Sequence, residues 1–142
     1  MERKDWLMLT VAAAGPRSLT PVQLQKALFL VGKNLATFVG PDFYKFIPYN
    51  YGPFSVDIYR DAKLLQQGGL VRIEPEQGQL PEYFATPQGN IRAADLRYSL
   101  LPGVASYIET VTRWTQQLTF PQLVTAIYAK YPEFRKNSVF KD

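Results

Sequence analysis

An aromatic, proline-containing turn that leads into a capped helix constrains this chain more than any other stretch. Residues 46–70 read FIPYNYGPFSVDIYRDAKLLQQGGL. Proline fixes φ, and Gly52 is free to adopt backbone conformations that other residues resist. Ser55 suits an N-cap, and apolar residues recur after it at helical spacing until two glycines end the helix, one of them expected to be left-handed. The stretch therefore predicts a shaped aromatic turn followed by an amphipathic helix.

Threonine, proline and glutamine mark the beginnings of other helices. A threonine caps, a proline occupies the first helical positions, and Gln23 and Gln122 stand where each completes a capping box. We expect further helices at 4–14, 21–38, 87–99, 104–118 and 120–131. The second of these has a wide apolar stripe and is predicted to be central. Its expected exposed side chains are Gln25, Lys26, Lys33 and Asn34.

A short β-hairpin follows the aromatic turn and its helix. Residues 70–73 and 80–85 alternate or carry aromatic β-formers, and the segment 75–78 between them is typical of a turn. Helix, helix, helix, hairpin is the order of a winged helix. We predict one mainly α (α+β) domain over residues 1–142, with a winged-helix-like core, one short hairpin and a basic, exposed tail at about 133–142.

Composition excludes several kinds of chemistry. The 142 residues include no cysteine and no histidine, which removes disulfides, thiolate or imidazole metal sites and serine–histidine catalysis. We therefore expect no catalytic residue, no cofactor and no metal. No apolar run approaches the roughly 20 residues of a membrane helix, and the N-terminus does not resemble a signal peptide. We expect a cytoplasmic protein that binds no membrane.

The aromatic residues around the turn allow two interpretations. They can cover the core, or they can form a surface that binds a ligand or partner, as exposed aromatic clusters often do. The candidate partner-binding residues are Phe43, Tyr44, Phe46, Tyr49, Tyr51 and Phe54.

A winged helix raises the alternative of DNA binding. The candidate DNA-binding residues are Arg60, Lys63, Gln67 and Arg72. The same helix face is expected to carry Asp57 and Asp61, and acidic residues outnumber basic ones over 55–86. Phosphate contacts require clustered cations, so nucleic acid is possible as a partner but not favoured.

An enzyme is the third alternative. Its acidic candidates are Asp57, Asp61, Glu74, Glu76 and Glu82. The sequence has no phosphate-binding glycine loop, and these carboxylates are more typical of a solvated surface.

Two segments resemble the Panacea-type antitoxin domain and related uncharacterised phage-associated proteins. These proteins show a T-x-x-x-LQK helix followed by an aromatic YGP turn. Leu24, Gln25 and Lys26 match the first motif, and Tyr51, Gly52 and Pro53 match the second. Ala27 departs from the family pattern, in which a second leucine is common. The resemblance covers most of the chain.

The resemblance implies a binding module without chemistry of its own. Panacea domains occur beside toxins and neutralise them by direct contact, so the implied partner is a protein, such as a toxin encoded nearby. We expect the six motif residues to be structural. Our hypothesis is that the Gln25 amide and Lys26 bond the backbone of the YGP turn and hold it against the helix at 21–38.

Overall fold

A helix that begins at Pro21 lies in the middle of the computed structural model, which describes residues 1–75 and 79–141. The helices are α1 (Arg3–Ala13), α2 (Pro21–Asn34), α3 (Ala36–Val39), α4 (Val56–Gln67), α5 (Pro87–Tyr98), α6 (Pro102–Gln117) and α7 (Phe120–Lys130), followed by the 3-10 helix η1 (Pro132–Arg135). The strands are β1 (Ile47–Tyr49), β2 (Gly52–Phe54), β3 (Val71–Glu74) and β4 (Glu82–Ala85). The predicted mainly helical α+β class is confirmed.

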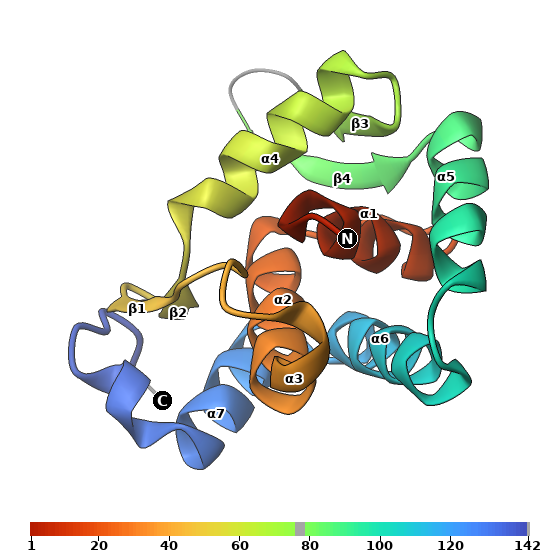
Figure 1. The fold of residues 1–142 in the computed structure, drawn as a ribbon. Helices are drawn as coiled ribbons and strands as arrows, with labels where there is room; N and C mark the ends of the chain where they lie inside the picture. The colour runs from red at the N-terminus through yellow and green to blue at the C-terminus, as the bar shows by residue number, and fades with distance from the viewer. Residues whose placement is uncertain (76–78, 142) are drawn as a thin grey trace.

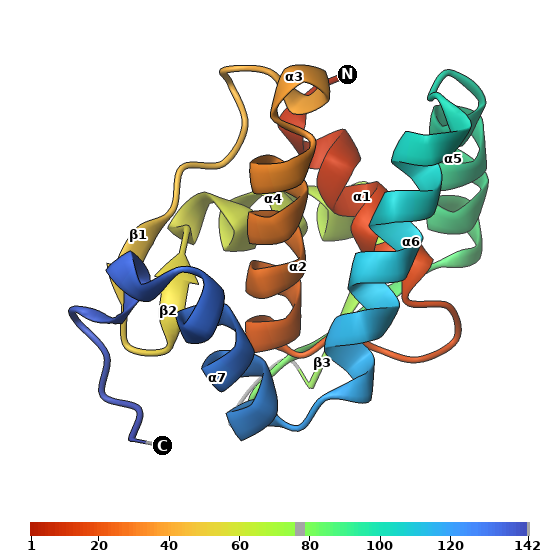
Figure 2. The same cartoon turned by 90° about the horizontal axis from the view of Figure 1, so that it is seen from below.

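The helix α2 contacts elements on several sides. Figure 2 shows it between α6 on one side and α7 with the β1–β2 hairpin on the other, and α1 also contacts it. Its residues Leu24, Leu28 and Val31 are fully buried. The prediction that this helix is central is confirmed, because its apolar stripe is wide enough to be covered from more than one direction.

The elements expected for the winged-helix-like core, α1, α2, α4 and the β3–β4 hairpin, occur in that order, with α3 and the β1–β2 hairpin inserted between α2 and α4. Figure 1 shows α1 beneath α4 and the β3–β4 hairpin, with α5 at its side. β4 pairs with β3, and Tyr83 of β4 also exchanges two backbone hydrogen bonds with Leu19, which lies between α1 and α2. The hairpin is therefore joined both to α4, which precedes it, and to the segment that precedes α2.

Most of the predicted helix boundaries agree with the structure, for local reasons. Thr20 with Gln23 and Thr119 with Gln122 form the predicted capping boxes, and the Thr86 hydroxyl accepts a bond from the Gly89 N–H. Gly69, after α4, has the predicted positive φ of 76°. These devices need only neighbouring residues, so the sequence is sufficient to predict them.

Two expectations about the fold are wrong. The helix expected at 21–38 ends at Asn34 and resumes as the short α3, which leaves Phe38 exposed. The structure has two hairpins among the described residues, not one, because β1 and β2 pair within the expected loop. Part of the turn expected at 75–78 lies outside the described residues.

The C-terminal segment is exposed at most of its described residues, as expected, but it also packs against the rest of the fold. Phe134 is buried, and its ring packs edge-on against Phe29 of α2 with centroids 4.9 Å apart. Further along, the Val139 N–H donates to the Asn50 carbonyl at 3.0 Å, and the Asn137 amide donates to the Pro48 carbonyl at 3.2 Å. The segment therefore supports the β1–β2 hairpin. Within the described part of the chain, no helix combines the length and apolarity needed to cross a membrane.

A close approach between α5 and the segment after α4 gives a test of the fold. A Cβ on Gly89 would overlap the Leu70 carbonyl oxygen, which is backbone and cannot move aside cheaply. We expect Gly89→Ala to lower the free energy of unfolding by about 2 kcal/mol, although alanine has the better helix propensity. Gly103→Ala is the matched control, since nothing lies within 4 Å of its added methyl group in the first turn of α6. If urea titrations gave the two variants the same free energy of unfolding, the close packing of Gly89 against the Leu70 carbonyl would be contradicted.

Candidate functional site

The β1–β2 hairpin is a short, rigid element. Its register pairs Pro48 with Pro53 and Tyr49 with Gly52, so two prolines with fixed φ face each other across the strands. Gly52 has a φ of 105°, which L side chains rarely adopt. A Cβ there would also lie 3.3 Å from the ring of Tyr128 in α7 and 3.6 Å from Cε of Lys26 in α2. Gly52 thus lets both helices approach the hairpin.

Gln25 joins α2 to the end of this hairpin. Its amide nitrogen donates to the Ser55 carbonyl, and its amide oxygen accepts from the Ser55 N–H, both at 2.9 Å. Gln25 is 2% exposed and Ser55 is 5% exposed, so water does not compete for these bonds. Ser55 does occupy the N-cap position of α4, but its side chain makes no capping bond, so the expected hydroxyl cap is wrong.

Lys26 makes a second link to the same hairpin. Its ammonium nitrogen donates to the Pro53 carbonyl at 3.3 Å, and the residue is only 3% exposed. Burial lowers the pKa of Lys26 to about 7, because the charged form loses its hydration. The hypothesis that both side chains bond the backbone of the YGP turn holds for Lys26, which bonds Pro53. Gln25 instead bonds Ser55, two residues beyond the turn. The expectation that both side chains are exposed is wrong, since the hairpin covers the polar side of α2.

An apolar groove of about 590 Å³ opens beside these two residues. We call it the aromatic groove. Gln25, Lys26 and Gly52 are among its most buried lining residues. Its other apolar and aromatic lining residues are Pro21, Val22, Tyr49, Tyr51, Phe54, Tyr59, Leu80 and Phe120. The rings form two contacting groups. In the first, Phe54 contacts both Tyr49 and Tyr59. In the second, Tyr51 contacts Phe120.

The six aromatic candidates separate into two groups. Tyr49 and Tyr51 are 47% and 41% exposed and line the aromatic groove together with the half-buried Phe54. Phe43 and Tyr44 are buried, so their assignment to a partner-binding surface is wrong; Gly32 of α2 leaves room for the Phe43 ring. The remaining candidate, Phe46, is half-buried and packs edge-on against Phe29.

The candidate DNA-binding residues form no cationic cluster. Arg60 pairs with Asp57 at 3.0 Å, and Arg72 pairs with Glu74 at 3.2 Å while its guanidinium lies over Phe84. The Lys63 and Gln67 side chains are exposed on α4. The basic groups of this face therefore alternate with carboxylates, which weakens any attraction for phosphate.

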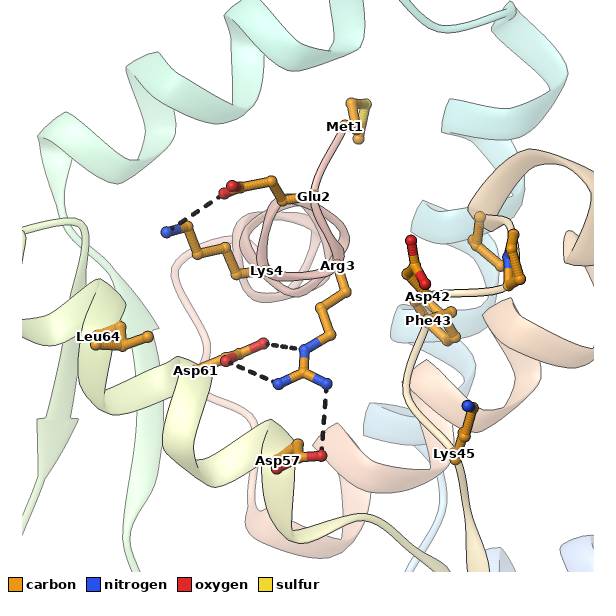
Figure 3. A pocket seen from close by; sticks show the side chains of 12 residues that line it. Met1, Glu2, Arg3, Lys4, Asp42, Phe43, Lys45, Asp57, Asp61 and Leu64 are labelled. Carbon is orange, nitrogen blue, oxygen red and sulfur yellow. Dashed lines mark hydrogen bonds and ion pairs between the residues drawn. The ribbon is translucent and has the colours of Figure 1, made fainter.

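A second, polar pocket lies where α1, α4 and the loop before β1 meet. Figure 3 shows Arg3 reaching toward Asp57 and Asp61, with Asp42, Phe43 and Lys45 across the pocket. The Arg3 Nε–Asp61 Oδ2 distance is 2.9 Å. The Tyr44 hydroxyl donates to the same carboxylate oxygen at 2.6 Å.

These bonds cross-link the fold at the polar pocket. Burial and the bond to Asp61 raise the pKa of Tyr44, so its hydroxyl stays a donor. Asp61 is 6% exposed, so the expectation that it lies on the outer face of α4 is wrong.

The acidic candidates of the enzyme alternative are divided between two places. Asp57 and Asp61 form ion pairs with Arg3. Glu74 and Glu82 lie opposite each other in the register of the β3–β4 hairpin. Glu76 lies outside the described residues. Within residues 1–75 and 79–141, no group of three or more acidic side chains is arranged to hold a metal ion.

Several lining residues of the groove were not among the sequence candidates, and Phe120 and Leu80 are the exposed apolar ones among them. Phe120 belongs to the N-terminus of α7, and Leu80 precedes β4 and is 79% exposed. The Thr119 cap places Phe120 at the first position of its helix, where a side chain often lies outside the core. That signal could have raised Phe120 as a surface aromatic, but nothing local brings it to Tyr51.

Comparison with known proteins leaves the site to be interpreted from its own geometry. No family model matches the chain, and no curated protein matches it in sequence.

The Gln25 link gives a direct stability test. Gln25→Ala would leave the Ser55 N–H and carbonyl buried without these partners, and each such group costs about 1–3 kcal/mol. We expect the variant to lose about 3 kcal/mol of unfolding free energy in urea titrations. Gln67→Ala on exposed α4 is the control and should change stability by less than about 0.5 kcal/mol. If the two variants unfolded at the same urea concentration, the link would contribute nothing.

The Lys26 pKa predicts how stability depends on pH. The pKa falls from 10.5 in the unfolded chain to about 7 in the folded protein. Between these values the unfolded chain holds the proton and the folded protein does not, so stability rises with pH by up to about 1.4 kcal/mol per unit. Wild-type protein should therefore gain about 2 kcal/mol relative to Lys26→Met between about pH 7 and pH 9. Parallel stability curves for the two proteins would show that Lys26 titrates normally.

Proposed function

We propose that this chain is a non-enzymatic protein-binding module, antitoxin-like or regulatory, that acts by direct contact with a partner protein. The observation that carries the proposal is the aromatic groove. Tyr49, Tyr51 and Phe120 are each more than 40% exposed around it. Tyrosine and other aromatic residues are enriched where proteins bind each other, since they supply large contact area with little side-chain entropy to lose.

Rigidity of the hairpin favours this use of the groove. The prolines of β1 and β2, the Gln25 and Lys26 bonds and the C-terminal segment all restrain the hairpin before any partner arrives. A surface that is already ordered loses less conformational entropy on binding.

The two short motifs also support an antitoxin-like role. The LQK residues Gln25 and Lys26 bond the backbone at or just after the YGP turn, so the two motifs serve one local structure. That coupling gives a physical reason for both to occur together in Panacea-type proteins. A toxin encoded nearby is the partner that the resemblance implies, and the cytoplasm is the compartment we propose.

Capture of a partner tests the proposal. Tagged wild-type protein, purified from the organism that encodes it, should retain one protein in stoichiometric amount. The double substitution Tyr51→Ala with Phe120→Ala should weaken that association by at least about tenfold, because central aromatic residues dominate interface energies. Surface-immobilised wild-type and variant proteins, titrated with the recovered partner, provide the measurement.

Tyr98→Ala is the matched control, since Tyr98 is 95% exposed on α5 and does not line the groove. It should bind the partner as the wild type does. If the recovered protein is toxic when expressed alone, co-expression with the wild type should restore growth and co-expression with the double variant should not. Repeated failure to recover any stoichiometric protein, or equal binding by all variants, would contradict the proposal.

A further inference from the structure

The Lys26 ammonium has unused hydrogen-bonding capacity. An ammonium group carries three donors. Among the described residues, Lys26 makes one hydrogen bond, to the Pro53 carbonyl. None of the ion pairs within the described part of the chain includes it. A buried charge of this kind is costly unless a counter-charge compensates it.

The described residues around Lys26 offer no such counter-charge. Among residues 1–75 and 79–141, the groove lining includes no aspartate or glutamate, and Lys26 is its one charged side chain. The titratable groups that line it with Lys26 are Tyr49, Tyr51 and Tyr59, and Tyr128 lies behind Gly52. All four are phenols, and none supplies a carboxylate. The groove is thus an apolar surface with a single buried cation, complementary to an apolar group that carries a single anion.

The shape of the groove favours a protein segment. Tyr51 and Phe120 remain more than 40% exposed, and Leu80 still more so, so an occupant would cover surface well beyond Lys26. Lys26 itself is only 3% exposed, so little of its side chain is open to solvent. An acidic side chain between two apolar ones presents a narrow anionic tip with wide apolar flanks.

We propose that the partner inserts an aspartate or glutamate side chain, flanked by apolar side chains, into the aromatic groove, where its carboxylate pairs with Lys26. This assignment rests on the proposed function and names the chemistry of the partner. The pair is a charge-assisted hydrogen bond in a site shielded from water, where such bonds are stronger than in solution. A neutral side chain at the same place would leave the cation unpaired, so the groove selects against it.

Capped peptides test the chemistry directly. The probes are acetyl-Leu-Glu-Tyr-amide and its neutral counterpart acetyl-Leu-Gln-Tyr-amide, which differ in one carboxylate and have no terminal charge. In isotope-labelled wild-type protein, the Glu peptide should shift the amide resonances of Tyr51 and Gly52 and the Cε resonance of Lys26. It should bind at least about tenfold more tightly than the Gln peptide. With Lys26→Met the difference between the two peptides should disappear, and Lys26→Gln serves if that variant does not fold.

The pH series needs no variant. A carboxylate pairs with the protonated amine, and Lys26 has a pKa of about 7 in the free protein. Affinity for the Glu peptide should therefore fall at least tenfold between about pH 6 and about pH 9, whereas affinity for the Gln peptide should not fall. Equal affinity for both peptides, or no shift at the groove with about 10 mM of either, would overturn the proposal.

A small carboxylate distinguishes the other class of occupant. If 3-phenylpropionate binds more tightly than the Glu peptide, the groove is a small-molecule site and the assignment to a protein segment is overturned. Capture of the natural partner separates this inference from the proposed function. A partner that depends on Tyr51 and Phe120 but binds Lys26→Met equally well would leave the proposed function intact and overturn the carboxylate pair. Absence of any partner would contradict the proposed function, while the peptide titration would still decide the role of Lys26.

Discussion

The paired hydrogen bonds between the Gln25 amide and the Ser55 backbone are the interaction on which the rest of the site depends. They fix the point where the β1–β2 hairpin passes into α4, and they do so from the central helix α2. An amide side chain suits this place because it donates and accepts at once, as the backbone of one residue does. With that junction fixed, Gly52 lies against Lys26, and the hairpin aromatics gather over the N-terminal half of α2. The groove is therefore a consequence of how two segments about 30 residues apart are joined.

Burial of Lys26 has a different meaning from burial of Gln25. Gln25 satisfies both ends of its amide inside the protein, so its burial favours the fold. Lys26 gives up hydration for one carbonyl bond and a lowered pKa, which reduces stability at neutral pH. Costs of this kind concentrate at functional sites, because a group that is imperfectly satisfied in the free protein can gain from a ligand. The polar pocket around Asp61 is the contrast, since Arg3 and Tyr44 already compensate that carboxylate.

Sequence reasoning succeeded where the determining residues are neighbours. The threonine caps, the glutamine capping boxes, the left-handed Gly69 and the β3–β4 hairpin were all predictable. The same reasoning placed Gln25 and Lys26 on a solvent-facing side of α2, and Asp61 on the outer side of α4. These errors share one cause. Helical periodicity shows which side of a helix is polar, but it does not show whether a distant segment of the chain covers that side. The motif pairing suggested that both side chains bond the YGP turn, because two short motifs implied one shared structure; Lys26 does so, and Gln25 bonds Ser55 just beyond it.

By itself, the sequence determined the helical elements, the fold class and the absence of cysteine and histidine chemistry, since these follow from composition, spacing and local capping. Only the tertiary structure decided which aromatic residues are free. It buries Phe43 and Tyr44, leaves Tyr49 and Tyr51 exposed, and brings Phe120 beside Tyr51 from the other end of the chain. It also encloses a lysine in an apolar groove, and that result depends on the hairpin, α2 and α7 meeting at Gly52. Contacts of such long sequence separation arise from packing of the whole core, which no local pattern encodes.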